Sequence, residues 1–454
     1  MPTRGVVNRS ERQVRAFRAS STLVLGAGTR LRLVGEESVK EGRRRRARRE
    51  EERVTRKSLA QIMAEARELG PKIVSWRRHL HMHPESSMRE HETAAYVVER
   101  LREIGIERVR EGVGQTGVVA LVRGRERKTV GLRADMDALE LEEANQVRYR
   151  SRRPGLMHAC GHDAHVACLL GAAAILHRRR ARLAGGVKLI FQPGEEGAGG
   201  ARFMLADGVL ERPKLRAIAA LHVDTQVDSG KIGIRRGYDT AQTEDVRLVV
   251  RGKTAHAARP DQGVDAIAVA SQALIAIQQF VARHTDSVDR KLVTFGIIRG
   301  GTRVNVLADQ VELIGTIRTL EKEGREAILR FLKRDLRKLV GAMGARLEVR
   351  IDKNGYPPLV NDDRVVDVVA GAARGMLGLE GLVDVPKPNL GGEDFAYFGL
   401  GGVPAAMFRL GIRDEKKGFT SAGHSSTFDL DDRRVLPVGA AMMAATAVGM
   451  LEGF

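Results

Sequence analysis

The chain has 454 residues, enough for two or three domains, and its hydrophobic fraction of 43% is ordinary for a globular protein. More than half of its net charge of +19 lies in residues 1–57 and only 4% of the residues are aromatic, so we expect no nucleic-acid partner. Two cysteines, the lack of an apolar run as long as a membrane span, and an Arg-rich start predict a cytoplasmic protein without disulfides, membrane contact or a signal peptide.

Residues 1–57 differ in composition from the rest of the chain, and we expect them to form a basic, disordered extension. Arg43–Arg49 reads RRRRARR and is followed by three glutamates, and such charge blocks are usually disordered or form a solvated helix. Gly26-Ala27-Gly28 is only a fragment of a dinucleotide-binding fingerprint, because the third glycine is missing, so we expect no cofactor there. An alternative is that the segment is an upstream extension from a mis-assigned start codon.

Residues 58–240 alternate between helical repeats and short apolar strands, which is typical of an α/β layer architecture. We expect a break in the first helix at Gly70-Pro71. This segment forms the first part of a larger, catalytic domain, in which we expect a mixed sheet flanked by helices. The hydrophobic pattern predicts helices at 59–75, 94–104 and 166–177 and strands at 118–122, 129–132, 187–191 and 217–222.

Residues 241–351 form a separate unit that is inserted into the larger domain. Its order of elements, βαββαβ, is that of the ferredoxin-like split motif. Residues 352–454, which end in a helix of small residues near 439–450, complete the larger domain. For the inserted unit the pattern predicts a strand at 246–250, a helix at 266–282, strands at 292–298 and 306–317, a helix at 325–340 and a strand at 346–351.

The segment Met157–His165 reads MHACGHDAH and combines several side chains that bind metals. Cys160 and His162 are two residues apart and cannot share a helix face, but in a loop both could reach one ion. Thiolate and imidazole are good ligands for zinc, nickel or cobalt. A lone Cys or His is more often a satisfied buried residue, but three His, a Cys and an Asp within eight residues favour a metal site.

The segment Gln192–Glu196 reads QPGEE and directly follows a predicted strand, so Glu195 and Glu196 lie on a turn. Two adjacent carboxylates are costly to bury unless a positive group lies beside them. A solvated acidic turn is the alternative. With a metal nearby, one glutamate can bind the ion while its neighbour accepts a proton from water.

Other polar side chains also fall at predicted strand ends or in loops, where α/β enzymes gather their sites. His222 ends the strand 217–222, and Asp137 lies in the segment RADMD after the strand 129–132. His424 lies in a Gly-rich loop. These positions predict that the three side chains meet at one edge of the sheet.

Eleven segments together resemble one family: WRRHLHMHPE (76–85), LRADMDAL (132–139), MHACGHDAHVACLLGAA (157–173), FQPGEEGAGGA (191–201), LHV (221–223), GKIGIRRG (230–237), GKTAHAARPDQGVDAI (252–267), GGTRVNVLAD (300–309), GTIRT (315–319), GGEDFAYF (391–398) and GHSSTFDLDD (423–432). They are similar to the aminoacylase and carboxypeptidase family of dinuclear metallopeptidases. The most similar branch holds hippurate hydrolases, thermostable carboxypeptidases and indole-acetyl-amino-acid hydrolases. The resemblance extends from about residue 58 to the end of the chain.

The resemblance implies a metal-dependent amidohydrolase that cleaves N-acyl amino acids or C-terminal peptide bonds. It implies two divalent ions, with zinc favoured by availability and cobalt, nickel or manganese left open. Glu195 matches the general base, which accepts a proton from the attacking water and delivers it to the leaving amine. Cys160 matches a ligand shared by both ions. The implied metal ligands are Cys160, His162, Glu196, His222 and His424.

The resemblance also assigns residues around the metals. His256 matches a donor to the oxyanion that in related enzymes reaches into the partner subunit, because the inserted domain is the dimer interface; a homodimer or homotetramer is thereby implied. Asn305 and Arg318 match positions that hold the substrate's free carboxylate. Asp137 is expected to orient a metal-binding histidine. Without the resemblance, His256 would be read as the cap of its loop, and Asn305 and Arg318 as polar surface.

The sequence departs from the family pattern without losing an implied catalytic residue. The last segment reads HSSTFD where the branch usually has a His-Thr-Pro run. An alternative from another class is a basic nucleic-acid-associated or scaffolding protein with a structural metal site. Glu195 separates the two hypotheses, because a closed structural site has no use for an unligated carboxylate beside a ligand.

Overall fold

The computed structural model describes residues 36–286, 288–352 and 355–454, with side chains from residue 57 onward. The expectation for residues 1–35 therefore lies outside the described residues. The backbone of 36–57 is helical and belongs to α1 (Glu36–Met82). A helix is one of the two forms that the sequence allowed for this charge block.

Helix α1 runs without interruption through Pro71, so the predicted break at Gly70-Pro71 is wrong. Proline inside a helix costs about 3 kcal/mol, because it removes a hydrogen bond and crowds the preceding turn. Large apolar side chains on both sides of Pro71 are buried in the main core, and each contributes about 1.5–3 kcal/mol. Their packing outweighs the cost of the proline. They are Ile62, Leu69, Ile73, Val74 and Trp76.

Eight strands form the mixed sheet of the larger domain, in the order β1-β2-β4-β3-β5-β14-β6-β13. The central pairs β4·β3, β3·β5 and β5·β14 are parallel, whereas β1·β2, β2·β4 and β14·β6 are antiparallel. The predicted mixed sheet is confirmed. The strands are β1 (Val109–Val113), β2 (Gly117–Val122), β3 (Thr129–Asp135), β4 (Gly186–Gln192), β5 (Leu215–Asp228), β6 (Ile232–Ile234), β13 (Leu382–Asp384) and β14 (Ala405–Arg413).

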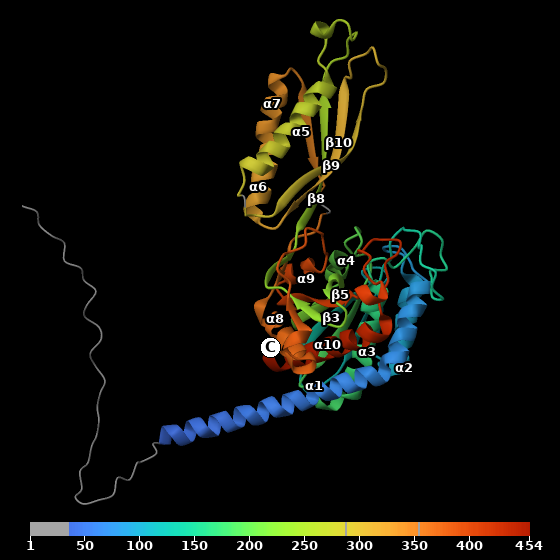
Figure 1. Ribbon diagram of the computed structural model, residues 1–454, viewed down its shortest axis with the longest axis vertical. Helices are drawn as coiled ribbons and strands as arrows, with labels where there is room; N and C mark the ends of the chain where they lie inside the picture. Colours follow the sequence, from blue (N-terminus) through green and yellow to red (C-terminus); the bar gives the residue numbers. More distant parts are fainter. Residues whose placement is uncertain (1–35, 287, 353–354) are drawn as a thin grey trace, which may run out of the picture. The chain divides into compact units, whose positions relative to one another are not determined.

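Helices cover both faces of this sheet, as predicted (Figure 1). One face packs against α1, α2 (His91–Ile104), α3 (His162–Arg178), α8 (Asp363–Leu377) and α10 (Asp432–Gly453), which together form the main core. The other face packs against the short helices α4 (Gly200–Ala206) and α9 (Ala396–Leu400). Every residue of β3 and β4 is buried, as expected for parallel strands covered on both faces.

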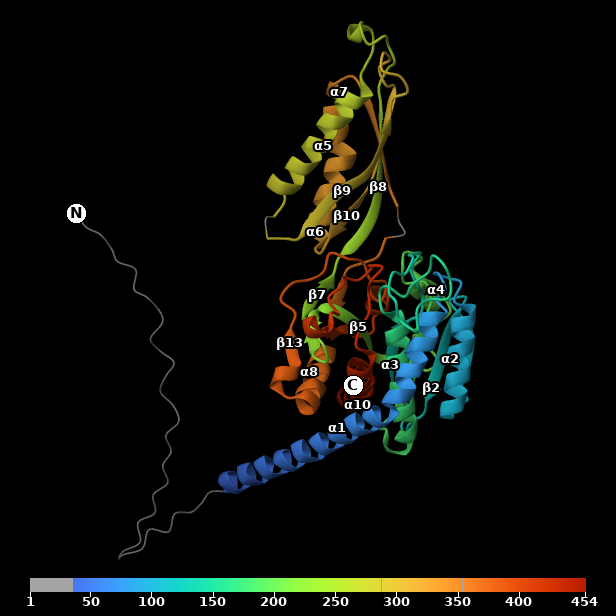
Figure 2. The same cartoon turned by 45° about the vertical axis from the view of Figure 1, so that its right-hand side comes forward.

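The inserted unit has its own core and a four-stranded antiparallel sheet in the order β11-β8-β10-β9, which confirms the ferredoxin-like motif. Its helices cover one face of that sheet (Figure 2). The strand predicted at 306–317 begins later, at Gln310. In order, the elements are β8 (Gln242–Arg251), α5 (Ala266–Arg283), β9 (Lys291–Gly300), β10 (Gln310–Thr319), α6 (Lys322–Arg330), α7 (Leu336–Ala342) and β11 (Arg346–Ile351).

Two connections join the inserted unit to the larger domain. The first leads from β7 (Gly237–Thr240) directly into β8, and the second leads from β11 to β12 (Leu359–Asn361). The strands β7 and β12 pair with each other in a two-stranded antiparallel sheet. The two crossings of the chain therefore lie side by side.

Two helices, α5 and α10, are long and apolar enough to cross a membrane by length and composition, which corrects the expectation that no segment reaches this length. Of the apolar window in α10, 78% is buried within the protein. Helix α5 buries a stripe at helical spacing against the inserted sheet, from Ala266 through Val269, Ala270 and Ala273 to Ile277. Helix α10 is therefore a core helix of the larger domain, whereas α5, with 28% of its apolar window buried, packs one face on the inserted sheet.

Candidate functional site

A cavity of about 1040 Å³ lies at the carboxyl edge of the parallel strands, where ligands of α/β sheets usually bind. Its walls come from the loop before α3, the turn after β4, the loop that contains His424, and the first or last residues of the inserted strands. Of the predicted site residues, it contains Cys160, Glu195, Glu196, His222, Arg318 and His424.

The loop before α3 brings Cys160 and His162 to the same space. Gly161 lies between them with a φ of 85°, and His162 is the first residue of the helix. A Cβ at Gly161 would lie 2.5 Å from a methyl carbon of Val223, so only glycine fits this turn. The Gly-rich loop docks here as well, because the His424 amide donates to the Ala159 carbonyl at 2.8 Å.

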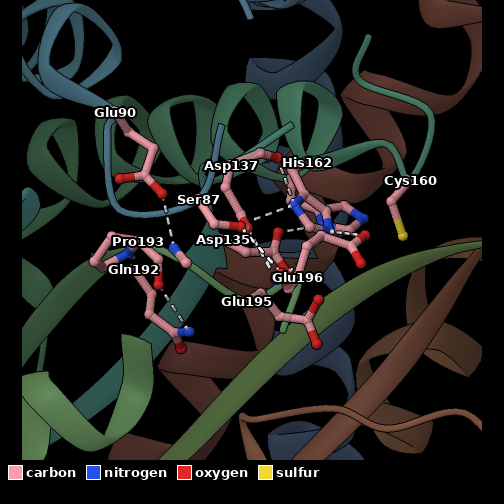
Figure 3. Close-up of polar contacts among 12 residues, drawn as sticks. Ser87, Glu90, Asp135, Asp137, Cys160, His162, Gln192, Pro193, Glu195 and Glu196 are labelled. Carbon is pink, nitrogen blue, oxygen red and sulfur yellow. Dashed lines mark hydrogen bonds and ion pairs between the residues drawn. The ribbon is translucent and has the colours of Figure 1, made fainter. Parts of the chain in front are cut away.

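The five predicted metal ligands form overlapping groups, and within each group the ligand atoms lie within 4.8 Å of one another. Cys160 belongs to two groups, one with His162 and His222 and one with Glu196 and His424. The Cys160 sulfur lies 3.6 Å from Nε2 of His222, and Nε2 of His424 lies 3.3 Å from Oε1 of Glu196. Figure 3 shows Cys160, His162 and Glu196 around a common space.

The chemistry of this donor set fits a cation. His162 Nε2 is buried and has no hydrogen-bond partner among the described residues, and the buried Glu196 Oε1 faces the His424 ring at 3.3 Å. A buried polar atom without a partner costs about 1–3 kcal/mol, and a bound cation would remove that cost. Thiolate, imidazole and carboxylate are together the ligands that zinc and similar ions prefer.

Asp137 holds two of these residues in place. Nδ1 of His162 lies 2.8 Å from the Asp137 carbonyl and 3.2 Å from Oδ1 of its carboxylate, so Nε2 faces the donor set. The other carboxylate oxygen accepts the Glu196 amide at 2.8 Å and the Ser87 hydroxyl at 2.6 Å (Figure 3). Asp137 therefore fixes both a ring and a backbone turn.

His165 supports β5 beside His222. Its Nδ1 lies 2.6 Å from Oδ1 of Asp135, and its Nε2 accepts the Val223 amide at 2.9 Å. Burial lowers the pKa of His165, and the two contacts fix a neutral ring with its proton on Nδ1. Both ring nitrogens are thus already used.

His222 lies inside a strand, although the sequence predicted that it ends one. Strand β5 continues to Asp228, because its parallel pairing with β14 extends past His222 through Val223 and Asp224. The partner strand, which the sequence pattern did not reveal, explains the difference. The ring still reaches the cavity from this position.

Glu195 is only 7% exposed and faces the cavity. Burial raises the pKa of Glu195, and the carboxylates of Glu393 and Glu196 raise it further. The sequence did not reveal the neighbours beneath it. The Arg133 guanidinium lies there and donates to Asp135 at 2.7 Å, to Glu393 at 3.1 Å and to Asp394 at 3.0 Å.

Two predicted site residues lie away from the cavity. His256 and Asn305 are exposed on the inserted unit, and the Asn305 carbonyl accepts an amide from the residue after His256. Nδ1 of His256 accepts the Ala258 amide at 3.1 Å, which is the loop-cap contact that the sequence alone suggested. Arg318, by contrast, lines the cavity and donates to the Leu390 carbonyl at 3.3 Å.

The family model described as Peptidase family M20/M25/M40 matches residues 131–448. Thermostable carboxypeptidase 1 of Saccharolobus solfataricus is 38% identical to the chain over 394 residues, 86% of this chain and 98% of that protein. IAA-amino acid hydrolase ILR1-like 2 of Arabidopsis thaliana is 37% identical over 389 residues, 84% of this chain and 87% of that protein.

A solved structure resembles the chain over a similar extent. It is the Bacillus subtilis YXEP protein, described as a dinuclear metal binding peptidase, with a TM-score of 0.73 and 33% identity. The match covers 85% of this chain and 99% of that one, so it includes both the larger and the inserted units.

Proposed function

We propose, from the premise that this chain belongs to Peptidase family M20/M25/M40, that it hydrolyses the amide bond of N-acyl amino acids or the C-terminal bond of short peptides. Membership confirms the resemblance predicted from the sequence, and the chain is a metal-dependent hydrolase of the peptidase and amidohydrolase kind. The alternative of a nucleic-acid-associated or scaffolding protein is therefore set aside. The observation that carries the proposal is a set of five metal-binding side chains beside Glu195, which runs from the buried His162 to the exposed His424.

Two divalent cations are proposed as cofactors, because the donor atoms form two groups that share Cys160. When bound, such ions polarise an amide carbonyl and lower the pKa of water. Zinc suits the thiolate and imidazole donors and is favoured by availability, with cobalt, nickel and manganese as competitors. The proposed ligands are Cys160, His162, Glu196, His222 and His424.

Glu195 is proposed as the general base. It is buried at the cavity wall beside Glu196, while the backbone of the same turn is held by Asp137. A carboxylate in this place accepts a proton from the attacking water and delivers it to the leaving amine. Arg318 is proposed to bind the free carboxylate of the substrate, because a guanidinium offers two parallel donors to a carboxylate.

His256 and Asn305 are proposed to act in the cavity of a second copy, in a homodimer or homotetramer formed through the inserted unit. Strand β9 is an edge strand of its sheet, and its exposed side chains include Ile297 at 41% and Ile298 at 59%. Exposed apolar edge strands readily pair with another chain.

A cytoplasmic location also stays a prediction.

A release assay tests the proposed function. The purified chain is dialysed, supplied with zinc, cobalt, nickel or manganese, and given hippurate, acetyl-methionine or a benzyloxycarbonyl dipeptide. We expect metal-dependent release of the free amino acid, and the ranking of substrates chooses between aminoacylase and carboxypeptidase activity. No release from folded protein with bound metal would contradict the proposal.

A further inference from the structure

The turn that contains Glu195 and Glu196 is held from several sides. Glu90 accepts the Gly194 amide at 2.8 Å, and Asp137 accepts the Glu196 amide at 2.8 Å. Both of these residues belong to the larger domain. The turn is also compact, since a Cβ at Gly200 would lie 1.8 Å from the Pro193 carbonyl oxygen. The position of the turn therefore depends on the groups that hydrogen-bond to it.

A third set of hydrogen bonds to the turn comes from the connection to the inserted unit. Tyr356 lies on the second crossing, between β11 and β12, and is 7% exposed. Its hydroxyl donates to the Glu195 carbonyl and accepts the Gly199 amide at 3.1 Å. One hydroxyl thus bridges the two ends of the turn.

Tyr356 is itself fixed to the first crossing. The Tyr356 amide donates to the Thr243 hydroxyl at 3.1 Å, and the Thr243 amide donates to the Tyr356 carbonyl at 2.9 Å. The two crossings are pressed together at this point, because a Cβ at Gly355 would lie 1.6 Å from the Thr243 carbonyl oxygen. A shift of either crossing would therefore move Tyr356.

We propose that Tyr356 is a positioning residue, through which the paired crossings of the inserted unit set the place of Glu195 at the cavity wall. The inference rests on the proposed function, in which Glu195 is the general base. The Tyr356 hydroxyl grips the backbone of the turn and leaves the carboxylate free for the substrate. Its removal disturbs the reaction step more than substrate binding, because Arg318 lies on another element.

Tyr356→Phe is the direct test, because it removes the hydroxyl and keeps the ring. We expect kcat to fall about 10- to 100-fold with KM within about twofold of the wild type and metal content unchanged. Independently of activity, hydrogen exchange of the Gly199 amide should become about two- to tenfold faster, since that amide loses its acceptor. Unchanged kcat, or faster exchange without a fall in kcat, would overturn the inference.

Tyr397→Phe is the matched control. The Tyr397 hydroxyl donates to the Gly355 carbonyl at 2.9 Å, so this change removes one hydroxyl at the same crossing and no direct hydrogen bond to the turn; its neighbour Arg202 keeps its own bond to the Ala198 carbonyl, at 3.3 Å. We expect kcat and Gly199 exchange to stay within about twofold of the wild type. An equal fall in kcat for both variants would mean that general loosening of the crossing, rather than the grip on Glu195, lowers the rate.

A second pair of variants tests the link to the first crossing. Thr243→Val removes the acceptor of the Tyr356 amide, whereas Thr243→Ser keeps it. We expect Thr243→Val to lower kcat less than Tyr356→Phe does, and Thr243→Ser to keep the wild-type kcat. Equal kcat values for the valine and serine variants would show that the Thr243 hydroxyl does not position Tyr356. If the wild-type chain releases no product, the proposed function is contradicted but the role of Tyr356 is not. The exchange rate of the Gly199 amide in Tyr356→Phe then decides whether the Tyr356 hydroxyl holds the turn.

Discussion

The larger domain and the inserted unit contribute to the site in different ways. In the larger domain, Asp137 hydrogen-bonds the His162 ring and the Glu196 amide, and the buried His165 ring accepts the amide of Val223, next to His222. In the inserted unit, His256 and Asn305 are exposed and lie outside the cavity of their own chain. The comparison predicts that one chain suffices to bind metal, whereas turnover needs a second copy.

The largest effect on kcat is expected at Glu195, which in the proposed function transfers a proton and binds no metal. Glu195→Gln keeps the size of the side chain but cannot accept a proton, so kcat should fall about 100- to 10,000-fold. Metal content, measured by elemental analysis, should stay at the wild-type level. The matched change Glu196→Gln should instead lower metal content. A Glu195→Gln variant that loses metal would place Glu195 among the ligands and break the comparison.

The next largest effect is expected at His256, and it tests whether this residue acts in the cavity of the partner subunit. His256→Ala should lower kcat about 100- to 1,000-fold if its ring supports the oxyanion, while metal content stays unchanged. Mixing it with Glu195→Gln subunits should restore activity, because one cavity of the mixed dimer then combines an intact Glu195 with an intact His256 from the other chain. If subunits demonstrably exchange and the mixture stays inactive, His256 does not act in the partner's cavity. It then acts within its own chain or only caps its loop.

The sequence predicted the parts of this comparison that lie in short motifs. Cys160 and His162 are close in the chain, so their spacing alone indicated a shared loop. The Arg133 cluster could not be predicted in this way, because Glu393 lies 260 positions further along the chain and only the fold brings the two together. The hydroxyl of Tyr356 is a similar case, since its partner at Glu195 is a backbone carbonyl and leaves no mark on the sequence.

The errors have a common origin in tertiary packing. The rule that proline ends a helix treats the helix alone, whereas α1 is held on both sides of Pro71 by buried side chains. The end of the strand at His222 was inferred from the apolar run, but pairing with β14 extends β5 through polar residues. Local patterns therefore gave the elements of the inserted unit and several elements of residues 58–240, and partner elements decided where some of them end.

A smaller effect is expected at Asp137, which supports ligands without binding the ion. Asp137→Asn places an amide where the carboxylate accepts the Glu196 amide and lies beside His162, so metal affinity should fall about 10- to 100-fold. Competition with a coloured chelator measures the change. Asp309→Asn, on the exposed surface of the inserted unit, is the matched control. Equal affinities for both variants would show that the donor set does not depend on its buried support.

The smallest effect concerns Arg318, a predicted site residue of the inserted unit that lines the cavity of its own chain. Arg318→Lys keeps the charge but loses the planar pair of donors, so KM should rise about tenfold with little change in kcat. The sharper measurement compares acetyl-methionine with acetyl-methioninamide, which lacks the free carboxylate. Wild type should prefer the acid, and the variant should lose most of that preference. If the preference survives, the carboxylate is bound elsewhere, and the inserted unit then contributes to its own cavity chiefly through the crossing at Tyr356.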